Sequence, residues 1–196
     1  KAFWLNAYNA FVMHTVITHY PIRGTAKGYP ANSIRQIPGA FDKTPHAVAG
    51  KQLTLDQIET TVIADFNDPR MYLALSRGAI GSGRLRSEAF STKAVDKQLD
   101  QTKHQFAVTP RWSKVDALGG KVSISPIISW RAAAFIKEYA DDAFDLPKRE
   151  PIELAVIGFL RPHLLSAEEE FVKKNAPRTA EEAFKVWKDV PGERRR

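Results

Sequence analysis

The stretch from Ala2 to Asn9 reads Ala-Phe-Trp-Leu-Asn-Ala-Tyr-Asn, and its apolar pattern continues past His14. The apolar residues recur at helical spacing until Pro21, and proline cannot continue a helix. The pattern therefore predicts a helix over residues 2–19 that packs centrally in the fold. The predicted buried face of this helix consists of Phe3, Ala7, Ala10, Phe11 and Ile17.

Local signals downstream predict short strands and further helices. A hairpin is expected from residues 46–48 and 51–53, and Thr54 with Gln57 forms a capping box for the helix that follows. The apolar run 71–75 predicts a buried strand, which a loop of small residues follows. The other predicted elements are a helix at 92–106, a hairpin of 112–116 and 121–124, and helices starting at Ser125, Pro151, Ser166 and Thr179. Together they predict an α+β fold, mainly helical with a small, mostly antiparallel sheet.

The composition is that of a globular protein and excludes several classes of function. The 196 residues include no cysteine, which rules out disulfides, thiolate metal sites and a cysteine nucleophile. No apolar run reaches the roughly 20 residues of a membrane-spanning helix, so no transmembrane segment is expected. Part of the formal charge of +7 lies in the tail at 193–196, and elsewhere basic residues mostly alternate with acidic ones. Because no Arg/Lys stripe carries stacking aromatic residues, we expect no specific nucleic-acid partner.

The sequence indicates neither a compartment nor an oligomeric state. The chain starts without Met, inside a helical pattern, and Lys1 offers no side-chain cap for the first helical N–H groups. We therefore expect upstream sequence to be missing, together with any signal for export to the periplasm or for secretion.

Several motifs, in this order, resemble the domain of unknown function 547 family (DUF547). They are the stretch from Ala2 to His14, Pro-Gly-Ala-Phe-Asp at 38–42, Leu-Thr-Leu-Asp-Gln-Ile-Glu at 53–59, Asp-Pro-Arg at 68–70 with the loop ending Arg-Leu-Arg at 84–86, and Ile-Ser-Pro-Ile-Ile-Ser-Trp at 124–130. The resemblance implies a core domain at 1–140, shortened at its N-terminus, and a helical extension at 141–196 that packs on it. It also implies a papain- or transglutaminase-like thiol fold.

The chain departs from this family at positions that carry chemistry. Where family members often have two cysteines around the small-residue loop, this sequence has Arg77 and Ser82. Two histidines and an aspartate that are frequent in the family correspond to Tyr72, Thr60 and Ala134. The thiol chemistry that the resemblance implies cannot operate here, so we predict a catalytically degenerate domain.

Asn6 and Asn9 lie three residues apart and therefore share a face of the first helix. A buried amide is costly unless it is hydrogen-bonded, so the favoured interpretation is that both tie the helix to a nearby loop. The alternative is a ligand-binding role, in which one amide polarises a ligand carbonyl or supports an oxyanion. His14, on the same helix, is either a hydrogen-bonded core histidine or a catalytic base.

Ser82 lies between two glycines after the predicted strand, where a nucleophile could be exposed. A catalytic serine needs a base within hydrogen-bond reach, and the candidates are His14 or another histidine. The full Gly-x-Ser-x-Gly pattern is absent, so the favoured interpretation is a small residue tolerated in a tight loop. A hydrolase or acyl transferase that uses Ser82 is the second functional hypothesis.

The five histidines show no metal-binding spacing. No His-x-x-x-His pair occurs, and His14 and His19 lie on different sides of a helix, so we expect no metal ion. No glycine-rich nucleotide fingerprint follows a predicted strand, and no cofactor is expected.

Arg77, Arg84 and Arg86 flank the glycines of the small-residue loop, and this pattern predicts an anion-binding site. Glycine lets backbone N–H groups approach a ligand, and arginine binds carboxylate or phosphate through two donors. The alternative, which is slightly favoured, is that the arginines pair with acids and hold the loop shut. The candidate acids are Glu59, Asp68 and Glu88.

The leading functional hypothesis is a degenerate domain that binds a small anionic ligand or a protein partner near residues 71–86. Its ligand-binding residues would be Asn6, Asn9, Glu59, Tyr72, Arg77, Arg84 and Arg86. The third hypothesis is an interaction module that binds partners through the C-terminal helices, and a continuous apolar patch on those helices would favour it.

Overall fold

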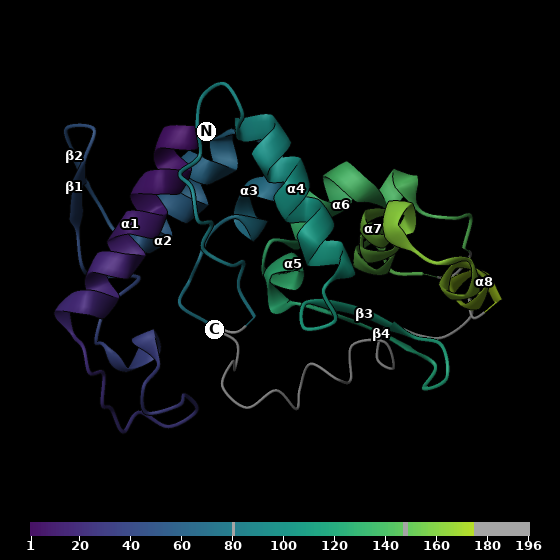
Figure 1. Ribbon diagram of the computed structural model, residues 1–196, viewed down its shortest axis with the longest axis horizontal. Coiled ribbons are helices and arrows are strands. Elements are labelled where there is room, and N and C mark those ends of the chain that lie inside the picture. Colours follow the sequence, from purple (N-terminus) through teal and green to yellow (C-terminus); the bar gives the residue numbers. More distant parts are fainter. Residues whose placement is uncertain (80, 147–148, 175–196) are drawn as a thin grey trace. The chain divides into compact units, whose positions relative to one another are not determined.

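The computed structural model describes residues 1–79, 81–146 and 149–174 (Figure 1). These residues form two compact units, the first over Lys1–Thr102 and the second from Lys103 onwards. The division into a core at 1–140 and an extension at 141–196 stays a prediction. The helix predicted after Thr179 and the basic tail at 193–196 lie outside the described residues.

The first unit contains a long N-terminal helix and a β-hairpin. Its elements are α1 (Ala2–Thr18), the 3-10 helix η1 (Ile34–Gln36), β1 (His46–Val48), β2 (Lys51–Leu53), α2 (Leu55–Gln57), the π-helix η2 (Ile58–Ile63), α3 (Arg70–Leu73) and the first part of α4 (Val95–Val108). The predicted helix at 2–19, the hairpin and the capping box are confirmed. β1 and β2 pair antiparallel, and the Thr54 hydroxyl accepts a hydrogen bond of 3.1 Å from the N–H of Gln57.

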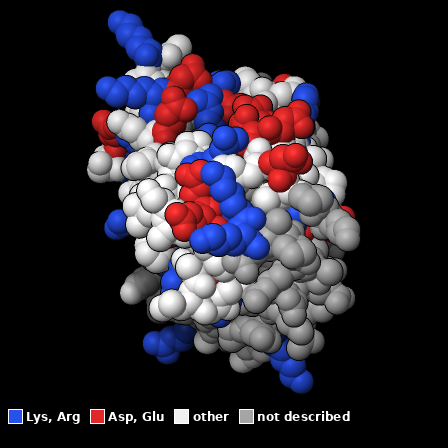
Figure 2. All heavy atoms as spheres, turned by 90° about the vertical axis from the view of Figure 1, so that its right-hand side faces the viewer, with Lys and Arg blue, Asp and Glu red and all other residues white. Residues whose placement is uncertain are grey.

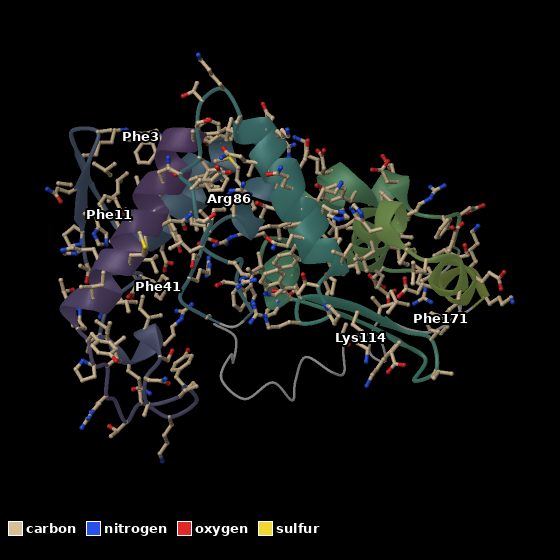
Figure 3. The ribbon with its side chains drawn as sticks, in the orientation of Figure 1. Phe3, Phe11, Phe41, Arg86, Lys114 and Phe171 are labelled. Atoms are coloured by element: carbon tan, nitrogen blue, oxygen red, sulfur yellow. The ribbon has the colours of Figure 1, made fainter. Side chains whose placement is uncertain are left out.

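α1 turns a different side inward than the one predicted. Its buried residues are Ala2, Leu5, Tyr8, Asn9, Val12 and Thr15. Phe3 and Ile17 are 56% and 72% exposed, and Ala10 is exposed as well. Ala7 and Phe11 are half-buried. Phe3 and Phe11 are labelled in Figure 3. The predicted face is wrong because α1 contains no Asp, Glu, Lys or Arg. Apolar residues therefore occur on every side of the helix, and spacing alone does not rank the sides.

The strand predicted at 71–75 is wrong, because this run begins as the short helix α3. The Asp68 carboxylate accepts a hydrogen bond of 3.2 Å from the N–H of Arg70, and Pro69 fixes a helical φ between them. Met71, Leu73 and Leu75 are nevertheless fully buried, as expected. A run of apolar residues without polar positions has no period, so it predicts burial but does not distinguish a strand from a helix.

The second unit arranges its helices around an aromatic cluster. After the end of α4 come β3 (Ser113–Asp116), β4 (Lys121–Ile124), α5 (Pro126–Trp130), α6 (Ala132–Tyr139), η3 (Ala140–Asp142), α7 (Pro151–Leu160), η4 (Arg161–His163) and α8 (Ser166–Lys174). Phe159 of α7 packs edge-on against Phe106, Phe135 and Tyr139, at ring-centroid distances of 6.5, 6.1 and 5.5 Å. Because neighbours surround α7, its residues 155–160 are all buried.

The fold class is α+β and mainly helical, as predicted. The described strands form two separate two-stranded antiparallel sheets, whereas the sequence predicts one small sheet. The start signal at Ser125 is confirmed, because its hydroxyl accepts a hydrogen bond of 3.4 Å from the N–H of Ile127. The helix predicted to follow is divided at Arg131 into α5 and α6.

Basic and acidic side chains are mixed on the surface, as the sequence predicts. On the face drawn in Figure 2, basic and acidic side chains are interspersed. In α8, Lys173 and Lys174 pair with Glu169 and Glu170 one helical turn earlier, at 2.5 and 3.2 Å. Among the helices that the structure describes, none combines the length and the apolar character needed to cross a bilayer.

Gly83 lies where the loop after α3 returns to that helix. A Cβ atom at this position would overlap the carbonyl O of Leu73, a backbone atom that cannot rotate away. We expect Gly83→Ala to lower the free energy of unfolding by about 1–3 kcal/mol, measured by urea denaturation. The matched control is Ser87→Ala at an exposed position of the same loop, which should change stability by no more than about 0.5 kcal/mol. Equal stability of the two variants would contradict close packing of the loop on α3.

Candidate functional site

Two asparagines of α1 hold the two ends of a segment that we name the clamped loop, of which the structure describes residues 77–79 and 81–89. The Asn9 amide donates to the carbonyl O of Ala74 (3.1 Å) and accepts from the N–H of Ser76 (2.8 Å). One turn earlier, the Asn6 amide donates to the carbonyl O of Phe90 (2.8 Å) and accepts from the N–H of Phe90 (2.9 Å). Each amide thus satisfies two backbone groups and ties α1 to one end of the loop.

At the start of the clamped loop, Arg77 forms a buried ion pair with Glu59 of η2. Arg77 Nη2 contacts Glu59 Oε2, and the two side chains are only 9% and 2% exposed. The hydroxyl of Tyr8, a fully buried residue of α1, donates to the same carboxylate oxygen at 3.4 Å. The three side chains therefore join α1, η2 and the clamped loop in one polar cluster.

Tyr8 enters this cluster as a neutral hydrogen-bond donor. Burial raises the pKa of the Tyr8 phenol well above its ordinary value, Arg77 opposes the shift and Glu59 adds to it. The phenol therefore keeps its proton at physiological pH. The charges in the cluster are those of Arg77 and Glu59, and they neutralise each other inside the protein.

Ser82 is 5% exposed, and its hydroxyl makes hydrogen bonds within the loop itself. Ser82 Oγ donates to the carbonyl O of Ala79 (2.8 Å) and accepts from the N–H of Arg77 (3.2 Å). His14 lies on an exposed position of α1 and takes part in neither hydrogen bond. The structure therefore does not join Ser82 and His14 as a nucleophile and its base.

His14 lies instead where its charge acts on His46 of β1. Burial lowers the pKa of His46, and a positive charge on His14 lowers it further. The His46 ring stacks on Phe11 of α1 with a centroid distance of 4.4 Å. His14 is thus near enough to the hairpin to influence His46.

The remaining predicted ligand-binding residues lie in or beside the clamped loop. Arg86 is half-buried, and its Nη2 donates to the side chains of Glu88 (2.8 Å) and Gln101 (3.1 Å) (Figure 3). Arg86 Nε is buried and has no hydrogen-bond partner among the described residues. Arg84 is exposed, whereas Tyr72 is buried on α3. Arg77 and Arg86 therefore contact the very acids that the loop-closing interpretation names, and Arg84 extends toward solvent.

An ion network around Asp68 was not predicted from the sequence. Asp68 accepts hydrogen bonds from Lys1 Nζ (2.7 Å) and from Nε and Nη2 of Arg70 (2.9 and 2.7 Å), and Arg70 Nη1 also donates to Asp100 (2.6 Å). Burial raises the pKa of Asp68, but the hydrogen bonds from Arg70 and Lys1 outweigh burial and hold the pKa below its ordinary value. The Asp-Pro-Arg motif marks this position, but Lys1 is 67 residues away and no local signal connects it.

A family model described as protein of unknown function, DUF547, matches residues 1–107, more than half of the 196-residue chain. The chain belongs to the DUF547 family. No curated protein and no solved structure matches it, so the papain- or transglutaminase-like arrangement stays a prediction.

In this DUF547 member, the positions where the resemblance places cysteines make structural contacts. Arg77 is ion-paired, and Ser82 hydrogen-bonds within its own loop. The Thr60 hydroxyl, at a position where the family often has histidine, donates to the carbonyl O of Asp56 (2.7 Å). Within the described part of the chain, no group of three or more His, Asp or Glu side chains is placed to hold a metal ion.

The Arg77–Glu59 pair should behave as a buried ion pair when its partners are replaced. We expect Arg77→Met or Glu59→Gln alone to lower the free energy of unfolding by about 3–5 kcal/mol, because each leaves one buried charge uncompensated. The double variant Arg77→Met/Glu59→Gln should recover most of this loss, since no buried charge remains. Urea denaturation of the four proteins in a double-mutant cycle measures the coupling. Additive losses in the double variant would contradict a direct pair.

Proposed function

We propose that this DUF547 domain has no catalytic activity and binds an anionic ligand through arginines of the clamped loop. The Arg77–Glu59 ion pair supports the first half of the proposal. Arg77 stands at a position where the resemblance places a cysteine, and arginine stays protonated at all ordinary pH values. It therefore cannot replace a thiolate as a nucleophile.

Ser82 gives little support to a hydrolase or acyl transferase. Its hydroxyl is buried and already donates its proton to the carbonyl O of Ala79. Nucleophilic attack requires a base that accepts this proton, and a backbone carbonyl is not such a base. The hydrogen bonds of Ser82 support a structural role in shaping the clamped loop.

Ser82→Ala tests the hydrolase hypothesis directly. We expect the variant and the wild type to hydrolyse a nitrophenyl ester at the same rate, equal to that of the exposed-loop control Ser87→Ala. The variant should also lose about 1 kcal/mol of stability, because the N–H of Arg77 loses its acceptor. Ester turnover by the wild type that disappears in Ser82→Ala alone would establish a serine enzyme and end the non-catalytic proposal.

Arg84 and Arg86 support the second half of the proposal. Arg84 is exposed, and Arg86 Nη2 is held by the exposed side chain of Glu88. A ligand carboxylate or phosphate can take the place of Glu88 when that side chain rotates into solvent. Arg86 Nε, which has no described acceptor, would provide a second donor for bidentate binding. The ligand is thus an anionic group, either on a small ion or on a protein partner.

Partner binding through the C-terminal helices has less support. The apolar side chains of α7 and α8 contribute to a cluster within the second unit. Its buried members are Leu146, Ile157 and Val172, and Val115, Ala143, Phe144, Leu154, Leu164 and Phe171 pack against them. In the described part of these helices, most apolar surface is therefore already used for packing.

Phosphate or succinate should stabilise the protein when ionic strength is held constant with NaCl. At about tenfold excess over Kd, mass action predicts a rise in Tm of about 3–5 °C. Arg84→Ala and Arg86→Ala should each reduce this rise, whereas Arg23→Ala, which removes an exposed arginine outside the loop, should retain it. Differential scanning fluorimetry provides the measurement. An unchanged rise in both loop variants, or none in the wild type, would exclude this anion site.

A further inference from the structure

The second unit contains a contact between two histidines that are 59 residues apart in the chain. His104 of α4 and His163 of η4 bring their Nδ1 atoms to 3.2 Å. The ring centroids are 5.0 Å apart, and the ring planes are inclined by 64°. One Nδ1 carries a proton and donates it to the other Nδ1, because two protonated or two unprotonated Nδ1 atoms would repel each other at this distance. One proton therefore lies between the two nitrogens.

This nitrogen separation is also the one that a transition-metal ion requires. A Zn²⁺ ion binds imidazole nitrogen at about 2.0–2.1 Å, and two ligands at the tetrahedral angle are then about 3.3 Å apart. The observed distance of 3.2 Å between the two Nδ1 atoms is close to this value, and a small rotation of either ring would remove the difference. A metal ion can therefore bind both Nδ1 atoms once the Nδ1 proton has moved to Nε2 of the same ring or to solvent.

The histidine pair is open to solvent on one side. His163 is half-buried and His104 is exposed, so an ion from solvent can reach the pair. A metal ion binds imidazole through a nitrogen lone pair, so it competes with protons for these nitrogens.

The surroundings of the pair limit the affinity and select the kind of ion. Lys103 Nζ lies 4.6 Å from the centroid of the Tyr139 ring, and its charge opposes a second cation nearby. Among the described residues no third His, Asp or Glu joins the pair, so water completes the coordination of the ion. Imidazole ligands suit Cu²⁺, Ni²⁺ and Zn²⁺, whereas Mg²⁺ and Ca²⁺ prefer oxygen ligands.

We propose that His104 and His163 form a two-histidine site for a divalent transition metal, with water as the remaining ligands. The ion links the second half of α4 to η4, the turn that follows α7. A ligand that binds the folded state alone stabilises it, so the metal acts as a removable cross-link within the second unit. The expectation from sequence that no metal binds rested on local histidine spacing, which does not detect this pair.

Isothermal titration of the chelator-treated protein with Cu²⁺, Ni²⁺ and Zn²⁺ tests the proposal. The expected order of affinity is Cu²⁺ above Ni²⁺ and Zn²⁺, and Mg²⁺ should give no heat. His104→Ala and His163→Ala should each weaken Cu²⁺ binding by more than about 10–100-fold. Losses of this size already follow when a residue that only hydrogen-bonds to a metal ligand is removed. His19→Ala removes an exposed histidine of the first unit and should leave the affinity unchanged. Unchanged Cu²⁺ affinity in both site variants would overturn the proposal.

Electron paramagnetic resonance of the wild type with one equivalent of Cu²⁺ provides a test without variants. Nitrogen couplings from two imidazoles are expected at pH 7.5, and they should disappear toward pH 5 as protons compete for the nitrogens. A spectrum with one imidazole nitrogen or none at pH 7.5 would equally overturn the site, even if a histidine variant failed to fold.

Discussion

The first unit depends on the burial of one charge pair, Arg77 with Glu59. Either side chain alone would be expensive to remove from water, so the positions of both must be set by the elements that carry them. η2 brings the carboxylate, the start of the clamped loop brings the guanidinium, and α1 adds the hydroxyl of Tyr8. A shift of any of these elements would separate the charges inside the protein, and the pair therefore restricts all three.

The asparagines of α1 supply the geometry that this pair needs. Asn9 fixes the backbone at residues 74 and 76, directly before Arg77, and Asn6 fixes it at Phe90. Their spacing of one helical turn sets where the two ends of the loop meet α1. A charge pair and two amides thus accomplish at this site what apolar packing accomplishes elsewhere in the core.

Features with local causes could be predicted from the sequence, and features with distant causes could not. The capping box at Thr54, the cap at Ser125 and both hairpins follow from residues a few positions apart, and all are confirmed. The inward face of α1 depends on which of its apolar sides meets the rest of the core. Because no charged residue identifies the solvent-facing side of α1, the sequence does not predict which side is buried. At 71–75 the apolar run has no period, so it predicts burial but not the helix that begins after Asp68 and Pro69.

In the candidate site, too, some contacts could be predicted from the sequence and others could not. Because a buried arginine is rarely unpaired, the sequence predicts an acidic partner for Arg77, and Glu59 is one of the candidates. The part played by Tyr8 was missed, since a tyrosine on an apolar helix gives no sign of where its hydroxyl points. The contact of His104 with His163 was missed for a stronger reason. It joins residues 59 positions apart, and only the packing of α7 and η4 near α4 reveals it.

The contacts that hold the clamped loop also affect how tightly an anion could bind. A loop that is free in the absence of ligand must lose conformational entropy on binding, and this loss weakens the affinity. Here the loop is already held at both ends by amides and at its start by an ion pair, and Arg86 is oriented by Glu88 and Gln101. Binding would then require rotation of one exposed carboxylate and little ordering of backbone. In the proposed anion site, the amides and the ion pair that hold the loop would also keep Arg86 in position for a ligand.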